Sequence, residues 1–304
     1  MKHPLVLSMA SLALCAGTAL AAPAVDAPEA SPSPVAETWN AKFQSTWVWQ
    51  DKASMSAAYS GAHSLQTRHE DSYSFTATLS LGWRPWAGTE LYLDPEAAQG
   101  KPLSDLSGLG GFTNGEMARS SGPTLKVYKA RALWRQTWNE GGETQAVASA
   151  ANQLAGTVDA RRWVLTAGNQ SVLDLFDNNA YSHDPRTQFL NWSLMTHGAY
   201  DYAGDARGYT WGVALERYWD AWVLRAGRFV LPKQPNQQAL DAQIMRRHGD
   251  QVELEHAHTW GGQPGKLRVL AFRNLAQQAR YRDALAANPV APDLGDVRTE
   301  VHVK

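Results

Sequence analysis

Apolar and polar residues alternate along several segments of the chain, and the segment SYSFTATLSLGW, residues 72–83, shows this most clearly. Tyr, Phe, Ala, Leu and Trp occupy one parity of this segment, whereas Ser, Thr and Gly occupy the other. Because successive side chains leave a β-strand in opposite directions, the alternation predicts a strand with one apolar and one polar face. A sandwich turns the apolar face to a core, whereas a membrane barrel turns it to lipid, so one strand leaves both architectures open.

Two other segments alternate as clearly, WNAKFQSTWVW at residues 39–49 and KVYKARALWRQTW at residues 126–138. In the second, Lys129, Arg131 and Arg135 share one parity, which predicts a strand face in contact with water. Weaker strands are predicted at residues 89–94, 161–169, 209–219, 221–231, 251–260, 266–274 and 296–304. The chain then supplies roughly ten strands, a number within the range of membrane barrels.

Connections between the predicted strands are of two kinds. Turn motifs such as RPWAG, NEGGE, WDAW and GGQPGK join some strands directly. The long connections cover residues 94–125, 170–208 and 232–250. Brief helices are predicted in SVLDLF, at residues 184–195 with Asp184 as the N-cap, and at residues 277–287. Short turns at one end and long loops at the other are typical of outer-membrane barrels.

The alternation alone fits a soluble sandwich as well as a membrane barrel. Three features favour the barrel: Trp and Tyr lie near the ends of the predicted strands, an export signal precedes them, and cysteine is absent from the mature chain. No mature segment has about 18 consecutive apolar residues, which excludes a helical membrane span. We therefore expect an all-β fold, an antiparallel transmembrane β-barrel.

The first residues form an export signal, because Lys2 precedes a short apolar run that ends in small residues. The predicted organisation is a signal peptide at residues 1–21, a disordered Pro- and Ala-rich lead-in at residues 22–38 and a β-barrel domain at residues 39–304. The single cysteine, Cys15, lies inside the signal. Disulfides, cysteine nucleophiles and cysteine-ligated metals are thereby excluded from the mature chain.

Composition excludes one class of partner. The 304 residues carry a formal net charge of −1, with 44% hydrophobic residues and 13 Trp. A nucleic-acid-binding protein normally carries a basic stripe and an excess of positive charge. We therefore expect no nucleic acid partner.

Four long blocks of sequence, residues 88–116, 152–212, 224–229 and 249–274, resemble the carbohydrate-selective porin family of Gram-negative outer membranes. The resemblance implies a monomeric, sixteen-stranded barrel in the bacterial outer membrane, with long loops that fold inward and narrow the pore. It implies passive, carbohydrate-selective diffusion of sugars, with no catalysis and no cofactor. Outer-membrane lipid and the barrel-assembly machinery are the further partners that it implies. The small Ser and Thr side chains of residues 72–83 leave room for an inward-folded loop.

The chain departs from this family at its C-terminus. Family members are longer and end in a strand whose last residue is aromatic, whereas this chain ends with RTEVHVK. We therefore expect a truncated member that lacks several C-terminal strands. A general diffusion porin, an outer-membrane barrel enzyme and a sugar-binding surface protein stay as alternative functions.

Sugars are neutral, carry hydroxyl groups and have apolar C–H faces, so a sugar channel uses donors, acceptors and aromatic platforms. By parity, the candidates for pore-lining contacts are Lys129, Arg131, Arg135, Arg162, Glu253 and Glu255. By position in the long connections, the candidates for the constriction loop are Arg119, Arg186, His197, Asp201, Asp205 and Arg207. The alternative for the first set is that these charges only stabilise the barrel wall. The alternative for the second set is that these residues form hydrogen bonds that only fix their loop.

Other chemistries have less support. His256 and His258 lie two apart on one parity, but no third ligand flanks them, so we expect no metal site. The motif DYAGDARG lacks the acidic spacing of a calcium loop. Neither a GxSxG elbow nor an HExxH pair occurs, so no catalytic residue is nominated and we expect no enzyme.

Overall fold

The computed structural model describes residues 35–61, 64–106, 113–117, 122–198, 200–294, 297 and 299–303. The predicted signal peptide and most of the predicted lead-in lie outside the described residues. None of the helices in the described part is long and apolar enough to cross a membrane.

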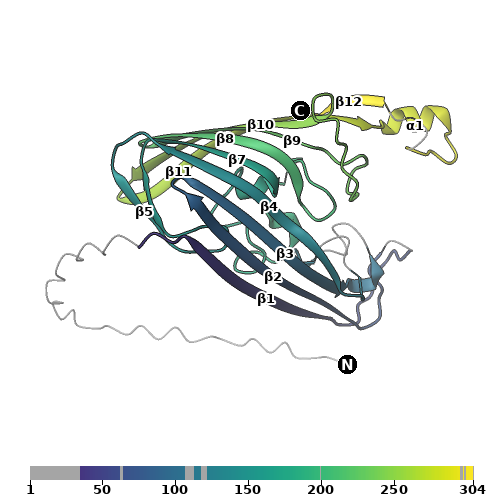
Figure 1. Cartoon of the computed structure of the whole chain (residues 1–304). Helices are drawn as coiled ribbons and strands as arrows, with labels where there is room; N and C mark the ends of the chain where they lie inside the picture. The colour runs from purple at the N-terminus through teal and green to yellow at the C-terminus, as the bar shows by residue number, and fades with distance from the viewer. Residues whose placement is uncertain are drawn as a thin grey trace. The chain divides into compact units, whose positions relative to one another are not determined.

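Ten antiparallel strands form one curved sheet, shown in Figure 1. In sheet order they are β1 (Trp39–Lys52), β2 (Glu70–Trp86), β3 (Thr89–Lys101), β4 (Lys126–Asn139), β7 (Arg162–Gln170), β8 (Thr210–Trp219), β9 (Trp222–Phe229), β10 (His248–Trp260), β11 (Gln263–Gln278) and β12 (Thr299–Val303). The order in the sheet follows the order in the chain, and among the described strands β1 and β12 form its two edges. The predicted all-β antiparallel architecture is confirmed.

Two further strands, β5 (Thr144–Val147) and β6 (Gly156–Asp159), form a separate hairpin between β4 and β7. The tight turn predicted from NEGGE is therefore wrong, because the connection runs through residues 140–161. Each strand of the hairpin has only four residues, too few for an alternating pattern to be recognised in the sequence.

Short turns join the strands at one end of the sheet, which we call the short-turn end. They are residues 87–88, 220–221 and 261–262. Positive φ angles at Gly88 (77°) and Asp220 (56°) close two of these turns. Long connections follow β1, β3, β7 and β9 at the opposite end, the long-loop end, which confirms the predicted alternation of turns and loops. The connection 140–161 is an exception, because it is long and yet emerges at the short-turn end.

The helical elements are short and lie in the connections. They are η1 (Leu103–Asp105), η2 (Val172–Asp174), η3 (Trp192–Leu194) and α1 (Tyr281–Ala287). The helix predicted in SVLDLF is the single turn η2. The helix predicted at residues 184–195 is wrong as a continuous element, because Asp184 closes one turn and η3 follows separately. The helix predicted at residues 277–287 begins late, since β11 extends into that range.

Side chains alternate between two faces of the sheet, as the sequence pattern predicts. On β2, one parity carries small polar side chains that are buried, namely Ser72, Ser74, Thr76 and Ser80. On the other parity, Leu79 and Leu81 are each 37% exposed and Trp83 is 55% exposed. We call the face of Trp83 the outer face and the opposite face the inner face. A soluble sandwich would bury the Leu and Trp parity, so this sheet has the inside-out pattern of a membrane barrel.

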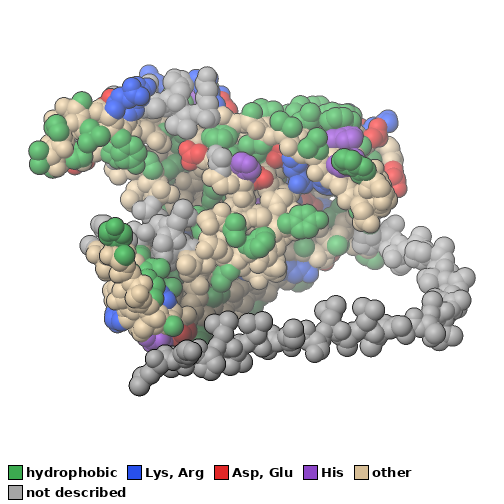
Figure 2. Space-filling model, turned by 180° about the vertical axis from the view of Figure 1, so that it is seen from behind, with side chains coloured by type: hydrophobic (Ala, Val, Ile, Leu, Met, Phe, Trp, Pro, Cys, Tyr) green, Lys and Arg blue, Asp and Glu red, His purple; other side chains and the backbone are tan. Residues whose placement is uncertain are grey.

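Large apolar side chains cover the outer face. Figure 2 shows hydrophobic side chains spread over the surface seen in that view. The exposed aromatic residues of the strands include Trp39, Phe43, Trp47, Trp83, Trp86, Trp138, Trp211, Trp222 and Trp260. Soluble monomers seldom expose contiguous apolar patches beyond roughly a few hundred Å². This face is therefore suited to lipid rather than to water.

Within the described residues, two apolar clusters pack on the inner face. In the first, the rings of Phe176 and Phe229 meet edge to face with centroids 6.1 Å apart. The Phe229 ring lies against the bare backbone of Gly212, where a Cβ would come within 2.2 Å of the ring. The second cluster consists of Tyr92, Leu133 and Leu154. Both clusters fasten connections to the inner face of the sheet.

Candidate constriction of the interior

Residues 113–117, in the connection between β3 and β4, fold onto the inner face of β2. Asn114 is fully buried, and its Nδ2 donates a hydrogen bond to Ser74 Oγ at 2.6 Å. The Thr76 hydroxyl donates to Glu116 Oε1. The small side chains of β2 leave the space in which this loop lies, as the sequence predicts.

The connection between β7 and β8, residues 171–209, also folds inward from the long-loop end. Phe176 anchors it in the first apolar cluster. The backbone N–H of Asp177 donates to Glu253 Oε2 of β10 at 2.8 Å. Apolar packing and a hydrogen bond to a buried carboxylate therefore hold this connection against the wall.

An ion pair joins these two inward-folded connections. Arg186 Nε donates to Glu116 Oε1 at 2.8 Å, and the Glu116 side chain is only 5% exposed. Burial raises the pKa of the Glu116 carboxyl above its usual value, although Arg186 and the Thr76 hydroxyl oppose the shift. A buried carboxylate requires such a partner, so the pair fixes the position of Arg186.

Arg131 of β4 binds one carboxylate of the wall and one of a loop. Its Nε and Nη2 each donate to Asp174 at 2.7 Å. Its Nη1 lies 3.4 Å from Asp94 Oδ2 on β3, and its Cζ lies 5.3 Å from the ring centroid of Tyr209. A bidentate Arg–carboxylate pair is strongly directional, so this contact fixes the guanidinium inside the sheet.

Two tyrosines form an aromatic surface beside these charges. The rings of Tyr128 and Tyr209 have centroids 6.3 Å apart, and Arg207 Cζ lies 4.2 Å from the Tyr128 centroid. The Tyr128 hydroxyl donates to one oxygen of Glu96, and the Thr78 hydroxyl donates to the other at 2.6 Å. Aromatic rings therefore lie next to a guanidinium and a carboxylate in this part of the interior.

Two cavities meet at this position. The larger, of about 880 Å³, is lined in part by residues 149–154 from the short-turn end. The smaller, of about 360 Å³, is lined in part by residues 183–186 from the long-loop end. The residues that line both cavities are Glu96, Arg131, Asp174, His183, Arg186 and Tyr209. We call these six residues the constriction set; it combines donors, acceptors and an aromatic ring.

Glu253 and Glu255 face inward, as parity predicts, but neither lines these cavities. Arg225 Nη1 lies 2.8 Å from Glu253 Oε1 and 3.0 Å from Glu255 Oε2. Lys266 and Arg268 also contact Glu255, each at 2.7 Å. These pairings support the alternative interpretation, in which the two carboxylates stabilise the wall.

The prediction that Lys129 shares a face with Arg131 is wrong. The pairing of β3 with β4 shifts at Pro95, so that Ala130 has no partner on β3 and forms a β-bulge. Lys129 is exposed, and its ammonium lies 4.5 Å from the ring centroid of Trp211, a residue of the outer face. The bulge thus separates Lys129 from the inward-facing arginines.

Arg135 and Arg162 line the larger cavity and hold the connection 140–161. Arg135 Nη1 donates to the carbonyl of Asn152 at 3.1 Å. Arg162 Nη1 donates to the carbonyl of Asp159 at 2.6 Å. Both side chains therefore anchor backbone at the short-turn end while they remain at the cavity surface.

Two of the predicted loop residues reach a cavity. Arg186 and Arg207 both line the smaller cavity, and Arg186 also lines the larger one. Their guanidinium groups lie beside Glu116 and the Tyr128 ring respectively. Arg119 lies outside the described residues.

His197, Asp201 and Asp205 line neither of the two cavities. The backbone N–H of His197 donates to Asp177 Oδ2 at 2.5 Å, and the carbonyl of Asp201 accepts from Asn274 Nδ2 at 2.6 Å. Asp205 Oδ1 accepts from the backbone N–H two residues further on, at 2.8 Å. These contacts support the alternative in which the three residues fix their loop.

Sequence reasoning does not nominate four members of the constriction set, namely Glu96, Asp174, His183 and Tyr209. For Glu96 a signal exists, because it shares the parity of Tyr92 and Asp94, and the predicted strand stopped just before it. Asp174 and His183 lie in a connection without periodicity, so no pattern in the sequence singles them out.

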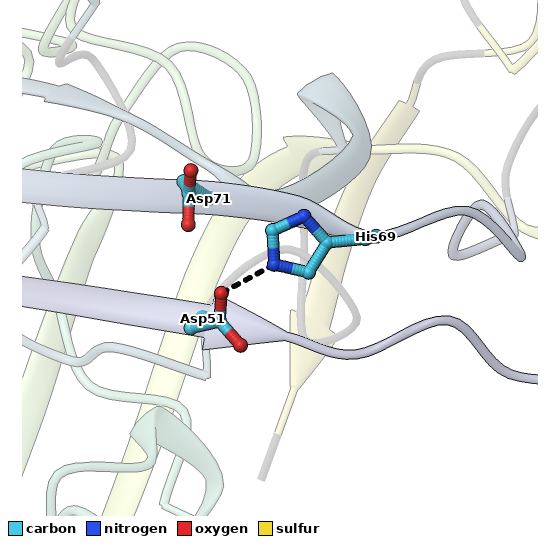
Figure 3. A group of neighbouring side chains, drawn as sticks. All are labelled: Asp51, His69 and Asp71. Atoms are coloured by element: carbon cyan, nitrogen blue, oxygen red, sulfur yellow. Dashed lines mark hydrogen bonds and ion pairs between the residues drawn. The ribbon is translucent and has the colours of Figure 1, made fainter.

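Three possible metal ligands lie together on the outer side of β1 and β2. The ligand atoms of Asp51, His69 and Asp71 all lie within 4.8 Å of one another, and His69 Nε2 is 2.5 Å from Asp51 Oδ2. Figure 3 shows the three side chains together and the contact between Asp51 and His69. All three residues are exposed. The ring centroids of His256 and His258 lie 6.1 Å apart, on the parity of exposed Val252 and Leu254. Both groups therefore belong to a different face from the constriction set.

The model of the carbohydrate-selective porin, OprB family, matches residues 62–300. A solved structure of OprB from Pseudomonas putida, determined at high pH, is similar in fold, with a TM-score of 0.58 and 13% sequence identity. The similarity covers 86% of this chain and 59% of that one, so the chain spans about three-fifths of the length of the solved protein. No curated protein matches the chain. Because the family model matches well over half of its residues, the chain belongs to the OprB family of carbohydrate-selective porins.

Proposed function

We propose that the chain forms part of an outer-membrane porin through which sugars diffuse passively down their concentration gradient. One observation carries the proposal: the two interior cavities meet at paired charges and an aromatic ring. Membership of the OprB family supports it. Because the chain spans 59% of the length of the solved protein that it matches, the proposal concerns the part of the channel that this chain supplies.

A sugar exchanges hydrogen bonds to water for hydrogen bonds to the wall as it passes a constriction. Arg131 and Arg186 supply fixed donors, and Glu96 and Asp174 supply fixed acceptors. The ring of Tyr209 offers an apolar platform to the C–H face of the sugar. No covalent bond is made or broken in such a passage, so we propose a channel rather than an enzyme.

The charges of the constriction set favour a neutral solute. Arg131 pairs with Asp174, and Arg186 pairs with Glu116, so each cation lies beside an anion. A lumen of a single sign concentrates ions of the opposite sign, whereas a mixed lumen produces a small net field. The field of the constriction set therefore does not concentrate ions relative to neutral sugars.

The same proposal assigns outer-membrane lipid as the partner of the outer face. Exposed Trp83 and Trp86 near the short-turn end support an interfacial position for that edge. The proposal includes export through a cleaved signal peptide at residues 1–21. It also includes insertion by the barrel-assembly machinery and a monomeric pore.

Liposome swelling tests the proposal directly. The chain is reconstituted into vesicles, and swelling rates are compared for a monosaccharide, a disaccharide and salts of similar hydrated size. We expect the monosaccharide to enter faster than the size-matched salt. Equal rates at equal size would identify a general diffusion porin instead. Saturable sugar binding without swelling would identify a sugar-binding surface protein.

A further inference from the structure

Residues 148–155, at the tip of the β5–β6 hairpin, enter the interior from the short-turn end, and we call them the inner strap. We propose that the inner strap positions Arg131 through Asn152 and Asp94, and so sets the constriction from the side opposite to the long loops. This assignment rests on the proposed function, because it gives that channel a positioning residue, Asn152.

Three hydrogen bonds fix Asn152 against the inner face of the sheet. Its backbone N–H donates to Ser80 Oγ at 3.1 Å, and its carbonyl accepts from Arg135 Nη1 at 3.1 Å. Its side-chain Nδ2 donates to Asp94 Oδ2 at 2.7 Å. The φ angle of Asn152 is +56°, in the left-handed region that Asn and Gly tolerate better than other residues.

The residues that precede β1 hold the inner strap in place. Glu37 Oε2 accepts hydrogen bonds from Ser149 Oγ and from the backbone N–H of Ala155, both at 2.9 Å. The backbone N–H of Glu37 donates in return to the carbonyl of Ala155 at 3.0 Å. Leu154, only 1% exposed, packs in the second apolar cluster. Contacts on both sides of Asn152 therefore restrict its movement.

Asp94 is the residue at which the inner strap meets the constriction. Its side chain is 1% exposed, and its Oδ2 accepts from Asn152 Nδ2 at 2.7 Å and faces Arg131 Nη1 at 3.4 Å. On its other side, the Arg131 guanidinium donates two hydrogen bonds of 2.7 Å to Asp174, from Nε and Nη2. Four side chains thus connect the inner strap to the long-loop connection 171–209.

A buried carboxylate is costly unless it is hydrogen-bonded. Asp94 Oδ1 has no hydrogen-bond partner within the described residues, so its Oδ2 contacts are its main compensation. If the Asn152 amide is removed, Asp94 loses its shorter hydrogen bond. The Arg131 guanidinium is then drawn toward Asp94 and away from Asp174, which loosens the turn that carries Asp174.

Hydrogen–deuterium exchange of the full chain, folded in detergent micelles, tests this coupling without requiring transport. Asn152→Gly deletes the amide and tolerates the same positive φ. We expect exchange of the amides of residues 174–176 to rise by at least about twofold. The matched control is Asn236→Gly, which removes an exposed Asn with φ of +58° from another connection. The control should leave exchange at residues 174–176 unchanged.

Faster exchange confined to residues 148–155 would overturn the proposal, because the inner strap would then be held by the wall without positioning Arg131. If Asn152→Gly does not fold, Asn152→Asp replaces it, since its ionised carboxylate has nearly the size of the amide but repels Asp94 instead of donating a hydrogen bond to it. The same rise at residues 174–176 is expected, and an unchanged rate contradicts the proposal. Absence of sugar transport by the wild-type chain would count against the proposed function alone.

Discussion

Arg186 and Glu116 form an ion pair of 2.8 Å that locks two connections together inside the curve of the sheet. One connection, residues 113–117, lies on the inner face of β2, and the other, residues 171–209, is held by β9 and β10. In their described residues, these connections contain only short 3-10 turns, η1 in the first and η2 and η3 in the second. The geometry of the constriction therefore depends on this pair and on the pair of Arg131 with Asp174.

Glu116 leads to a pH dependence with a definite sign. Because burial raises its pKa, the folded chain binds this proton more tightly than the unfolded chain between the usual Glu pKa of 4.5 and the raised value. In that window, the contribution of Glu116 to the free energy of unfolding decreases as pH rises. The Glu116→Gln variant lacks this contribution. The free energy of unfolding of the wild type minus that of Glu116→Gln, measured by urea titration in detergent, should therefore decrease as pH rises through this window. A difference that does not change with pH would contradict the raised pKa of Glu116.

The strands and their faces could be predicted because alternation is a local property of the sequence. The parity of residues 72–83 is the parity that β2 keeps in the sheet. The full length of β3 could not be predicted, since Pro95 lacks an N–H and normally ends a strand. Here Pro95 lies at the irregularity opposite Ala130, where the regular hydrogen-bond ladder is interrupted.

The constriction was only partly predictable, for two physical reasons. The position of Arg186 in a long loop marks it as a candidate, but its partner Glu116 comes from a different loop, and only tertiary folding brings them together. Parity puts Lys129 on the wrong face, because one bulged residue reverses the parity of everything beyond it. Neither effect leaves a mark in the alternation of apolar and polar residues.

Arg131→Gln and Lys129→Gln form a matched pair on one strand. Arg131 lines both cavities, whereas Lys129 lies on the outer face. Loss of a charged donor at the constriction should change the rate of sugar entry by roughly threefold or more, and should shift the reversal potential toward cation selectivity. Lys129→Gln should leave both quantities unchanged. Swelling assays and bilayer recordings measure them, and equal effects of the two variants would remove Arg131 from the constriction.

Gly212→Ala tests the anchor of the connection 171–209. A Cβ at Gly212 would lie 2.2 Å from the Phe229 ring and 2.6 Å from the backbone carbonyl oxygen of Arg228, so the ring that packs on Phe176 must shift. We expect a loss of about 1–3 kcal/mol in the free energy of unfolding and faster proteolysis within this connection.

Gly198→Ala is the control for that variant, because nothing lies within 4 Å of the added Cβ. Urea titration and limited proteolysis in detergent compare the two variants. If Gly212→Ala is as stable and as protease-resistant as Gly198→Ala, the Phe229 contact does not hold the connection.

Thr78 and Leu79 are neighbours on β2 whose side chains lie on opposite faces of the sheet. Thr78 lines the larger cavity, and Leu79 is 37% exposed among the apolar residues of the outer face. Because the single cysteine of the chain lies in the predicted signal peptide, Thr78→Cys and Leu79→Cys each introduce one thiol into the mature chain.

Labelling of these two variants in lipid vesicles with a charged, membrane-impermeant thiol reagent tests most directly whether the polar face lines the path of the sugar. We predict that the reagent modifies Thr78→Cys, that excess sugar slows this modification, and that Leu79→Cys stays unmodified. Modification of Leu79→Cys with protection of Thr78→Cys would show that the apolar face meets water, and would contradict a sugar path along the inner face.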